Sequence, residues 1–247
     1  MRSRPYGLIC PITRACDLLE PRWTIPILSE LWAGATKFNE LRRGIGSISP
    51  ALLSKRLKEL EDHGLIERIE DRAASTIDYV RTQMAIDLEP AMNSLAMWAQ
   101  KYIEAEIACD VNLSSMTWKM RRYIVTDELP NRRIVIRFHF RDDGLDYDTY
   151  WIVAEPGEPV QLCTSIPGFD VDLWVETSVP SLSAILLARS TIAREVEAER
   201  LFLSGDTLMS RTMHRWLHVT DYLPDGGPRE LSLEARKAVS LRRGPSF

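Results

Sequence analysis

The sequence predicts a protein of the α+β class that is divided into two domains. Its 247 residues exceed the usual size of one compact domain and suffice for two. Helical periodicities dominate residues 1–108, whereas most β-prone runs fall in residues 109–247. Charge is divided as well, because residues 1–105 carry 14 Lys/Arg and 14 Asp/Glu, whereas residues 106–247 carry 17 and 21. The net charge of −4 therefore belongs to the second half, and we expect domains at 1–108 and 109–247.

Composition is that of an ordinary globular protein, with 45% hydrophobic and 27% charged residues. No run of 18 or more apolar residues is present that could span a bilayer. No long apolar segment follows the charged N-terminus, as it would in a signal peptide. We therefore expect a cytoplasmic protein without a membrane partner.

The segment from residue 36 to residue 81 has the order helix, turn, helix and hairpin. These elements are expected at residues 37–43, 44–48 and 50–63, and in two β-prone runs at 66–69 and 77–80. This is the order of a winged helix-turn-helix, a unit that places its second helix in the major groove of double-stranded DNA.

The second of these helices has clear boundary signals. Ser49 is a favourable N-cap, and Pro50 occupies the first helical position, where no backbone N–H is needed. Leu53, Leu57 and Leu60 recur at a spacing that places them on one buried face. A basic helix with a leucine stripe is often only the solvated face of a packed helix, but the order of the surrounding elements favours DNA binding.

Local charge supports the same interpretation, because residues 36–58 contain six Lys/Arg and one acid. The side chains that fall away from the leucine stripe are candidates for reading the groove: Ser49, Ala51, Ser54, Lys55 and Lys58. Lys37 and Arg56 are candidate phosphate contacts, and Arg72 is the candidate contact from the tip of the wing.

Helices are also expected before and after this unit, at residues 10–19, 22–33 and 85–108. The last of these has a wide apolar stripe that includes Leu88, Leu95 and Trp98. We expect the stripe to pair with a second copy, because DNA readers of this type present two probe helices one duplex turn apart. Packing of the stripe against the second domain is the competing explanation.

The first domain resembles the HxlR family of bacterial transcription regulators, which are winged helix relatives of the MarR group. The resemblance covers residues 8–103 and rests on Cys10-Pro11, Leu18-Leu19, Arg22-Trp23-Thr24, Ile27-Leu28, Leu31, Phe38-Asn39-Glu40-Leu41, Ile48-Ser49, Leu52-Leu53-Ser54-Lys55-Arg56-Leu57, Leu60-Glu61 and Gly64-Leu65. It implies a homodimer that binds palindromic operator DNA through the helix at residues 50–63 and the wing.

The second half predicts a sheet followed by helices on one face. Strands are expected at residues 133–140, 150–153, 160–163, 171–176 and 200–203, and helices at 114–124, 179–187, 191–199 and 206–217. Gly205 permits a positive φ between the last strand and helix, and Asp206 can then cap that helix.

This half resembles the sterol carrier protein fold in Asp170-Val171-Asp172-Leu173-Trp174-Val175, in residues 182–188, in Leu201-Phe202-Leu203-Ser204-Gly205-Asp206 and in Trp216-Leu217. The resemblance implies an apolar tunnel between sheet and helices that holds lipid-like molecules. We therefore expect a small apolar effector, in a pocket lined by some of Phe138, Phe140, Trp151, Trp174, Leu186, Phe202, Met209 and Met213.

The four cysteines have no metal-site spacing, and free thiols are expected. Cys10 precedes Pro11 at the start of a helix, where the helix dipole lowers a thiol pKa, so a redox-sensing regulator is one alternative. No phosphate-binding loop, serine elbow or zinc-protease motif is present, and we expect neither metal nor cofactor. An enzyme that acts on an apolar substrate is the last alternative.

Overall fold

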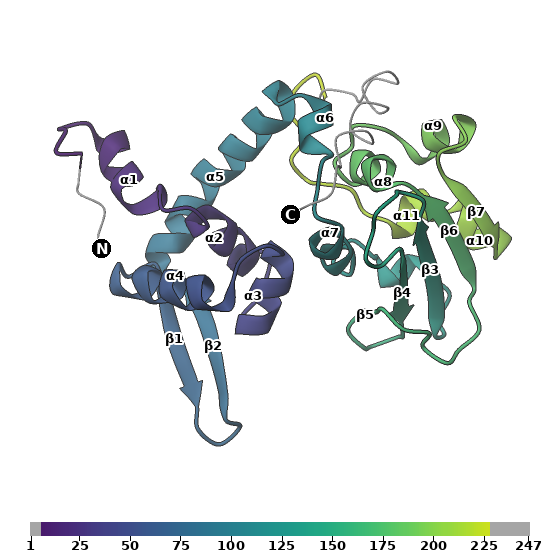
Figure 1. Cartoon of the computed structure of the whole chain (residues 1–247), viewed down its shortest axis with the longest axis horizontal. Coiled ribbons are helices and arrows are strands. Elements are labelled where there is room, and N and C mark those ends of the chain that lie inside the picture. Colours follow the sequence, from purple (N-terminus) through teal and green to yellow (C-terminus); the bar gives the residue numbers. More distant parts are fainter. Residues whose placement is uncertain (1–5, 228–247) are drawn as a thin grey trace. The chain divides into compact units, whose positions relative to one another are not determined.

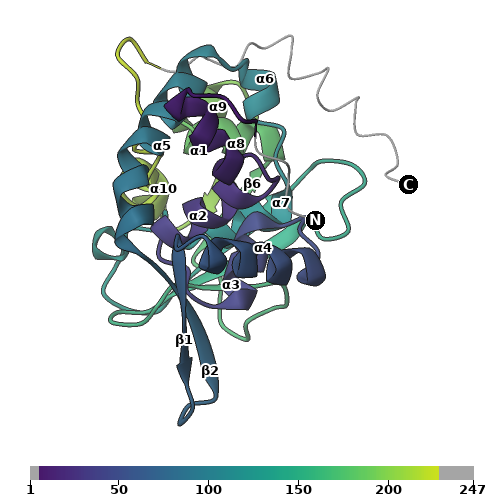
Figure 2. The same cartoon turned by 90° about the vertical axis from the view of Figure 1, so that its left-hand side faces the viewer.

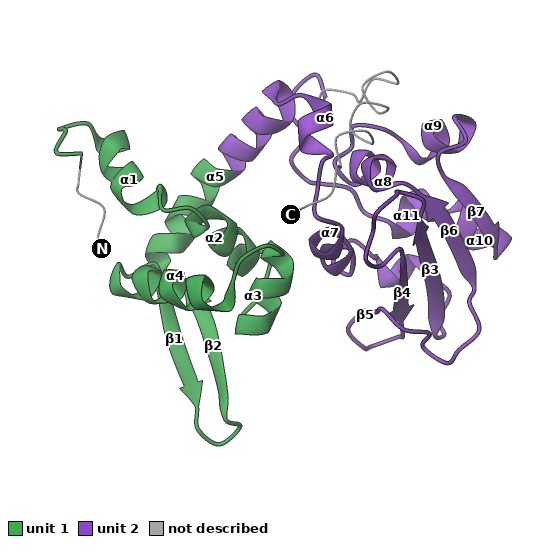
Figure 3. Ribbon diagram, in the orientation of Figure 1, with its two compact units in different colours: residues 1–92 green, residues 93–247 purple. Residues whose placement is uncertain are grey.

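The computed structural model describes residues 6–227. The chain forms two compact units, residues 1–92 and residues 93–247 (Figure 3). The division falls inside a long helix, α5 (Gln83–Tyr102), so each unit contains one part of that helix.

The first unit contains the predicted order of helices followed by a hairpin (Figure 1). Its elements are α1 (Pro11–Leu19), α2 (Thr24–Trp32), α3 (Phe38–Ile45), α4 (Pro50–Asp62), β1 (Ile66–Asp71), β2 (Thr76–Arg81) and the start of α5. The two strands pair in antiparallel register from Ile66 opposite Arg81 to Asp71 opposite Thr76. In both views the hairpin extends beyond α3 and α4 as a wing (Figures 1 and 2).

Helix α4 is bounded by the residues that the sequence nominates. The Ser49 hydroxyl accepts a hydrogen bond from the backbone N–H of Leu52 at 3.3 Å, and Pro50 begins the helix. Gly64 adopts a φ of +74°, which only glycine adopts at little cost. The N–H of Leu65 then returns to the carbonyl of Leu60 at 3.0 Å and closes the end of the helix.

The leucine stripe of α4 packs into the core of the first unit, as predicted. Leu53, Leu57 and Leu60 are all at most 3% exposed. They share this core with Ile27 and Leu28 of α2. Burial of one face of α4 leaves its other face in solvent, and that face carries the candidate groove residues.

The second unit is an α+β layer structure. Its elements are α6 (Ala105–Ala108), α7 (Leu113–Met120), the 3-10 helix η1 (Thr126–Glu128), β3 (Ile134–Phe140), β4 (Thr149–Ala154), β5 (Gln161–Cys163), β6 (Leu173–Thr177), α8 (Val179–Leu186), α9 (Ile192–Glu197), β7 (Phe202–Gly205), α10 (Thr207–Arg211) and α11 (Met213–Trp216). The sheet order is β5-β4-β3-β6-β7, in which only the β3–β6 pair is parallel.

One face of this sheet packs against helices to form the main core of the unit. Ile134, Ile136 and Phe138 of β3 contribute the sheet side of this core. Residues of α7, α8, α10 and α11 contribute the helix side, among them Met120 and Trp216. The α+β class and the placement of helices on one face are therefore as predicted.

The turn between β7 and α10 also follows the prediction. Gly205 has a φ of +115°, and an added Cβ would lie 2.4 Å from the carbonyl oxygen of Asp172. The Asp206 carboxylate accepts a hydrogen bond from the N–H of Met209 at 2.9 Å and caps α10.

Two predicted helices are shorter than expected. The helix expected over residues 85–108 ends at Tyr102, because Glu104 adopts an extended ψ of 140° before the short α6. The helix expected over residues 206–217 is divided at Thr212 into α10 and α11. None of the helices within residues 6–227 is long and apolar enough to cross a membrane.

Candidate nucleic-acid interface

The candidate groove residues lie together on the exposed face of α4. Ser49, Ala51, Ser54, Lys55 and Lys58 are all exposed, on the side of the helix opposite the leucine stripe. Small side chains at three of these positions leave room for the close approach of a helix to base edges. The structure therefore brings together the five residues that the sequence nominated, and contact of each with DNA remains a prediction.

The two lysines of this face stand beside carboxylates that lie further along α4. Lys58 Nζ is 2.9 Å from Asp62 Oδ1 and 3.3 Å from Glu61 Oε2, and these carboxylates raise the pKa of Lys58. Lys55 Nζ lies 4.0 Å from Glu59. A phosphate must compete with these exposed ion pairs, which are weak in water.

Arg56 and Lys37, the two predicted phosphate contacts, have partners within the first unit. The Arg56 Nε donates to the backbone carbonyl of Arg22 at 3.1 Å, and its guanidinium also pairs with Glu59. With 18% of its side chain exposed, Arg56 joins α4 to the connection before α2. Both assignments came from charge alone, and the long-range partners of these side chains were not visible in the sequence.

Lys37 takes part in a set of contacts between the start of α3 and the wing, which we term the wing clasp: Thr36, Lys37, Asp78 and Tyr79. The Asp78 carboxylate accepts a hydrogen bond from the Thr36 hydroxyl at 2.6 Å and pairs with the Lys37 ammonium. The backbone N–H of Tyr79 donates to the carbonyl of Thr36 at 2.9 Å. Lys37 and Thr36 hold the pKa of Asp78 below its usual range. These contacts join β2 of the wing to the helix-turn-helix.

The tip of the wing presents one cation. Arg72 is exposed in the turn between β1 and β2, and it makes no hydrogen bond or ion pair with any residue in 6–227. The turn is ordered by Asp71, whose carboxylate accepts hydrogen bonds from the N–H groups of Ala73 and Ala74 at 2.9 and 3.0 Å. Arg72 is therefore available for a phosphate.

Arg42 in the last turn of α3 is a second cation whose side chain makes no hydrogen bond or ion pair within residues 6–227. It is exposed, whereas the neighbouring Leu41 is fully buried. Arg42 belongs to the basic segment at residues 36–58 but is not among the residues that the sequence predicts to contact DNA. Its exposure and its lack of an ion pair make it a better phosphate candidate than Arg56.

All four cysteines are free thiols, and Cys10 is the exposed one. It occupies the N-cap position of α1. The backbone N–H of Thr13 is the main cause of a lowered pKa of the Cys10 thiol, with further contributions from the Thr13 side chain and the N–H of Ile12. An exposed thiol with a lowered pKa is the more reactive kind.

The residues proposed for the effector pocket lie in three different places. Phe138, Phe140, Leu186, Met209 and Met213 belong to the main core of the second unit. Trp151 belongs to a small cluster on the opposite face of the sheet, with Val135 and Val153. Trp174 and Phe202 are 40% and 43% exposed. Their common role in a pocket remains a prediction.

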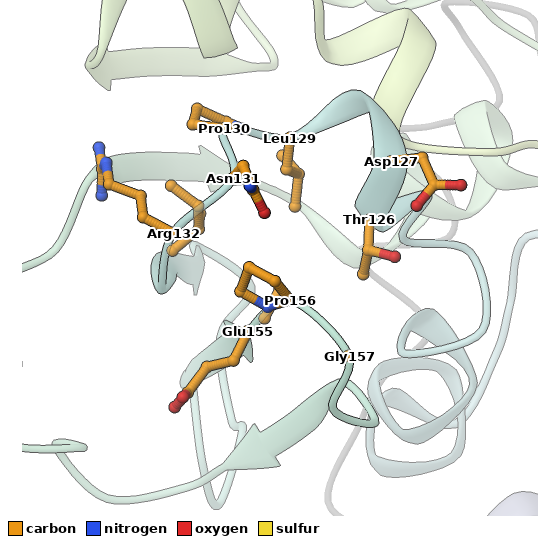
Figure 4. A pocket seen from close by; sticks show the side chains of 11 residues that line it. Thr126, Asp127, Leu129, Pro130, Asn131, Arg132, Glu155, Pro156 and Gly157 are labelled. Atoms are coloured by element: carbon orange, nitrogen blue, oxygen red, sulfur yellow. The ribbon is translucent and has the colours of Figure 1, made fainter.

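A hollow of about 280 Å³ lies elsewhere in the second unit, at the ends of β3 and β4 (Figure 4). Its apolar base includes Leu129, Ile134 and Ala154, and its rim includes Thr126 and Asn131. None of the eight predicted pocket residues lines it.

Comparison with known proteins matches the first part of the chain. The HxlR-like helix-turn-helix family matches residues 18–107. The chain is 30% identical over 108 residues to the uncharacterized HTH-type transcriptional regulator sll1512 of Synechocystis sp., which covers 43% of this chain and 79% of that protein. It is 32% identical over 98 residues to the uncharacterized HTH-type transcriptional regulator YvaP of Bacillus subtilis, covering 39% and 91%.

A third relative is the HTH-type transcriptional regulator YodB of Bacillus subtilis, 31% identical over 98 residues that cover 39% of this chain and 88% of that protein. The solved structure of the reduced form of YodB is similar at 30% identity and a TM-score of 0.36, covering 39% of this chain and 97% of that chain. YodB has also been solved in diamide-treated and quinone-bound forms. Through its first part, this chain belongs to the HxlR-like family of helix-turn-helix transcriptional regulators.

Proposed function

We propose that the protein is a homodimeric regulator that binds a palindromic operator through α4 and the wing, and that its second unit adjusts this binding in response to a small apolar effector. The observation that carries the DNA-reading part is the exposed face of α4. It presents small side chains and two lysines, and the wing adds an exposed arginine at its tip that has no partner within residues 6–227. This combination fits base contacts from the helix and phosphate contacts around it.

The direct test removes both lysines of this face. Genomic footprinting with the purified protein first identifies an operator. Lys55→Ala with Lys58→Ala should then abolish specific binding, while the thermal unfolding curve stays within a few degrees of the parent, because both side chains are exposed. Lys119→Ala with Arg211→Ala removes the same charge from the second unit and should leave operator affinity unchanged. Equal affinities of the two double variants would contradict the assignment.

Dimerisation is supported by apolar side chains that the first unit leaves in solvent. Helix α1 has no buried residue, and Ile9 and Ile12 are almost fully and three-quarters exposed. In α5, Met84 and Ile86 are also more than 40% exposed. A second copy that covers these side chains would remove them from water. Ile9→Asp with Ile12→Asp should therefore weaken self-association, measured by light scattering as a lower average molar mass than that of the parent at the same concentration.

The effector part rests on the large apolar core of the second unit, to which Met209 and Met213 contribute adaptable side chains. Native mass spectrometry of the purified protein should detect a bound apolar molecule, or a thermal-shift screen should find one that raises the melting temperature. If both give nothing, the second unit acts without an effector of this class.

A thiol sensor is the second candidate, favoured by the exposure of Cys10 and the lowered pKa of its thiol. The relative YodB, studied in reduced, diamide-treated and quinone-bound forms, makes the same chemistry relevant for this chain. Diamide should then change operator affinity, and Cys10→Ser should remove that response. Cys16→Ser is the control that should retain it, because Cys16 is partly buried.

A further inference from the structure

The sheet of the second unit has a second face that lies opposite the main core. Strand register places Trp151, Arg137 and Trp174 in one row across β4, β3 and β6. The next row contains His139 and Glu176, opposite Phe202 of β7. Along each strand, successive side chains point to opposite faces of the sheet. The sequence neighbours of these residues face the core, so these residues share the outer face.

No helix of the described chain contributes to the apolar cluster on this outer face, which consists of Val135, Trp151 and Val153 with Cys163 and Val171 packed beside them. The helices that cover the sheet all contribute to the cluster on the opposite face. The outer face is therefore open toward β6 and β7, where Trp174 is 40% and Phe202 is 43% exposed.

The Trp174 ring is already held in place on this face. A Cβ added at Gly205 would lie 3.0 Å from Trp174 Cε3, so the indole packs directly on the backbone of β7. The Arg141 guanidinium likewise lies over the Phe202 ring, 4.6 Å from its centre. Two rings that are fixed in this way lose little conformational entropy when a partner covers them.

Two charges on the same face have no partner within residues 6–227. Neither the Arg137 guanidinium nor the Glu176 carboxylate makes a hydrogen bond or an ion pair there. Other arginines at the ends of these strands are paired, since Arg132 contacts Asp172 at 2.7 Å and Arg133 contacts Glu155 at 2.6 Å. The open face thus carries one unpaired positive charge and one unpaired negative charge.

We propose that this outer face is a self-association surface, on which the second unit of one copy meets the second unit of another across a two-fold axis. A two-fold axis apposes identical patches, so a patch with one charge of each sign is complementary to itself. Arg137 of each copy then pairs with Glu176 of the other, and Trp174 and Phe202 are covered between the two ion pairs. A polyanion is a poorer fit, because Glu176 would repel it. This surface is independent of operator binding by the first unit.

Zero-length cross-linking of the full-length chain tests the proposal. Arg137→Lys keeps the charge and introduces an amine that a carbodiimide can join to Glu176. The variant is prepared with natural nitrogen and with ¹⁵N, the two pools are denatured, mixed and refolded together, and the cross-linked peptides are read by mass spectrometry. We expect amides between position 137 and Glu176 that include peptide pairs of mixed isotope composition, at up to half of the total, because the two side chains are also diagonal neighbours within one sheet.

Arg133→Lys is the matched control, because its partner Glu155 belongs to the same chain. Its cross-link to Glu155 should form without mixed isotope pairs, which shows that the chemistry works. Absence of mixed pairs at position 137, with this control positive, overturns the proposal. That result is also expected if residues 228–247 or another protein covers the face.

Charge reversal gives a second measurement on the same chain. Arg137→Glu should weaken self-association by at least about tenfold, because like charges then meet across the axis. Adding Glu176→Arg to the same chain exchanges the two charges and should restore it. If sedimentation velocity shows the single and the double variant to associate equally, and mixed isotope pairs are missing, the surface has no role in self-association.

Discussion

Asp78 shows at the scale of single residues how the wing is held. It joins β2 to the start of α3 through the Lys37 ammonium and the Thr36 hydroxyl. The pKa of Asp78 is lowered, so its contribution is complete above the pKa of about 3.9 for an unfolded aspartate. This contribution to stability is lost as the pH falls through the lower pKa that Asp78 has in the folded protein. The stability contributed by the wing clasp should therefore not change between about pH 5 and 8.

Asp78→Asn should therefore weaken operator binding at neutral pH, by roughly three- to tenfold, because it removes the ion pair that positions the wing. Hydroxyl-radical footprinting should show that protection by the wing is lost before protection by α4. Glu67→Gln makes the same change of charge on β1, where Glu67 is exposed, and should have little effect. Equal effects of the two variants on operator affinity would mean that the loss of one negative charge, and not the contacts of Asp78, weakens binding.

Gly44 leaves the space that the buried Glu30 carboxylate occupies. An alanine Cβ at this position would lie 2.1 Å from Glu30 Oε2, and Glu30 is only 2% exposed, so its carboxylate has little space to move. Gly44→Ala should lower the free energy of unfolding of the first unit by about 1–3 kcal/mol. Chemical denaturation measures this loss. In the double variant with Glu30→Ala, the loss should be smaller than the sum of the losses in the two single variants.

The scale of helices and strands shows what the sequence could predict. Each strand and most helices were predicted, because their apolar periodicity is local and their caps, such as Ser49 and Asp206, are adjacent. The C-terminal end of α5 was not, because long-range contacts decide where this helix stops. Arg189 is 1% exposed and donates to the carbonyl oxygens of Gln100 and Ile103 at 3.2 and 3.0 Å, where the helix stops.

Arg189→Met should therefore destabilise the second unit by about 2–4 kcal/mol, because the carbonyls at the end of α5 lose buried donors. The loss should be visible as a lower melting temperature in calorimetry. Arg211→Met changes an exposed arginine on α10 and should move the melting temperature little. Similar shifts of the melting temperature in both variants would show that the buried hydrogen bonds of Arg189 do not stabilise the second unit.

Site residues were predictable to a smaller extent than the elements. The exposed face of α4 follows from helical spacing alone, so its five candidates do lie together. Lys37 and Arg56 were assigned from charge, whereas partners 41 and 34 residues away occupy them. An apolar side chain such as Phe138 or Trp174 likewise has the same appearance in a sequence whether a closed core, a pocket or solvent surrounds it.

At the scale of the whole molecule, a net charge of −4 coexists with a DNA-binding unit because the acidic excess lies in the second half. Within the described part of the first unit, the exposed cations that we propose for contact with DNA are few and local: Lys55 and Lys58 on α4, Arg42 on α3 and Arg72 on the wing. The proposed homodimer would present each of them twice. The salt dependence of operator affinity should therefore follow the number of these cations that contact phosphates, and not the net charge of the chain.

The measurement that tests the central claim most directly is the salt dependence of operator affinity for the parent and for Lys55→Ala with Lys58→Ala. The parent should show log K falling linearly with log salt concentration, and each phosphate contact that is lost should lower the slope by roughly 0.9. A dimer that loses between two and four contacts should thus show a slope lower by about 2–4, together with loss of preference for the operator. The same slope and the same preference in both proteins would contradict DNA reading through α4.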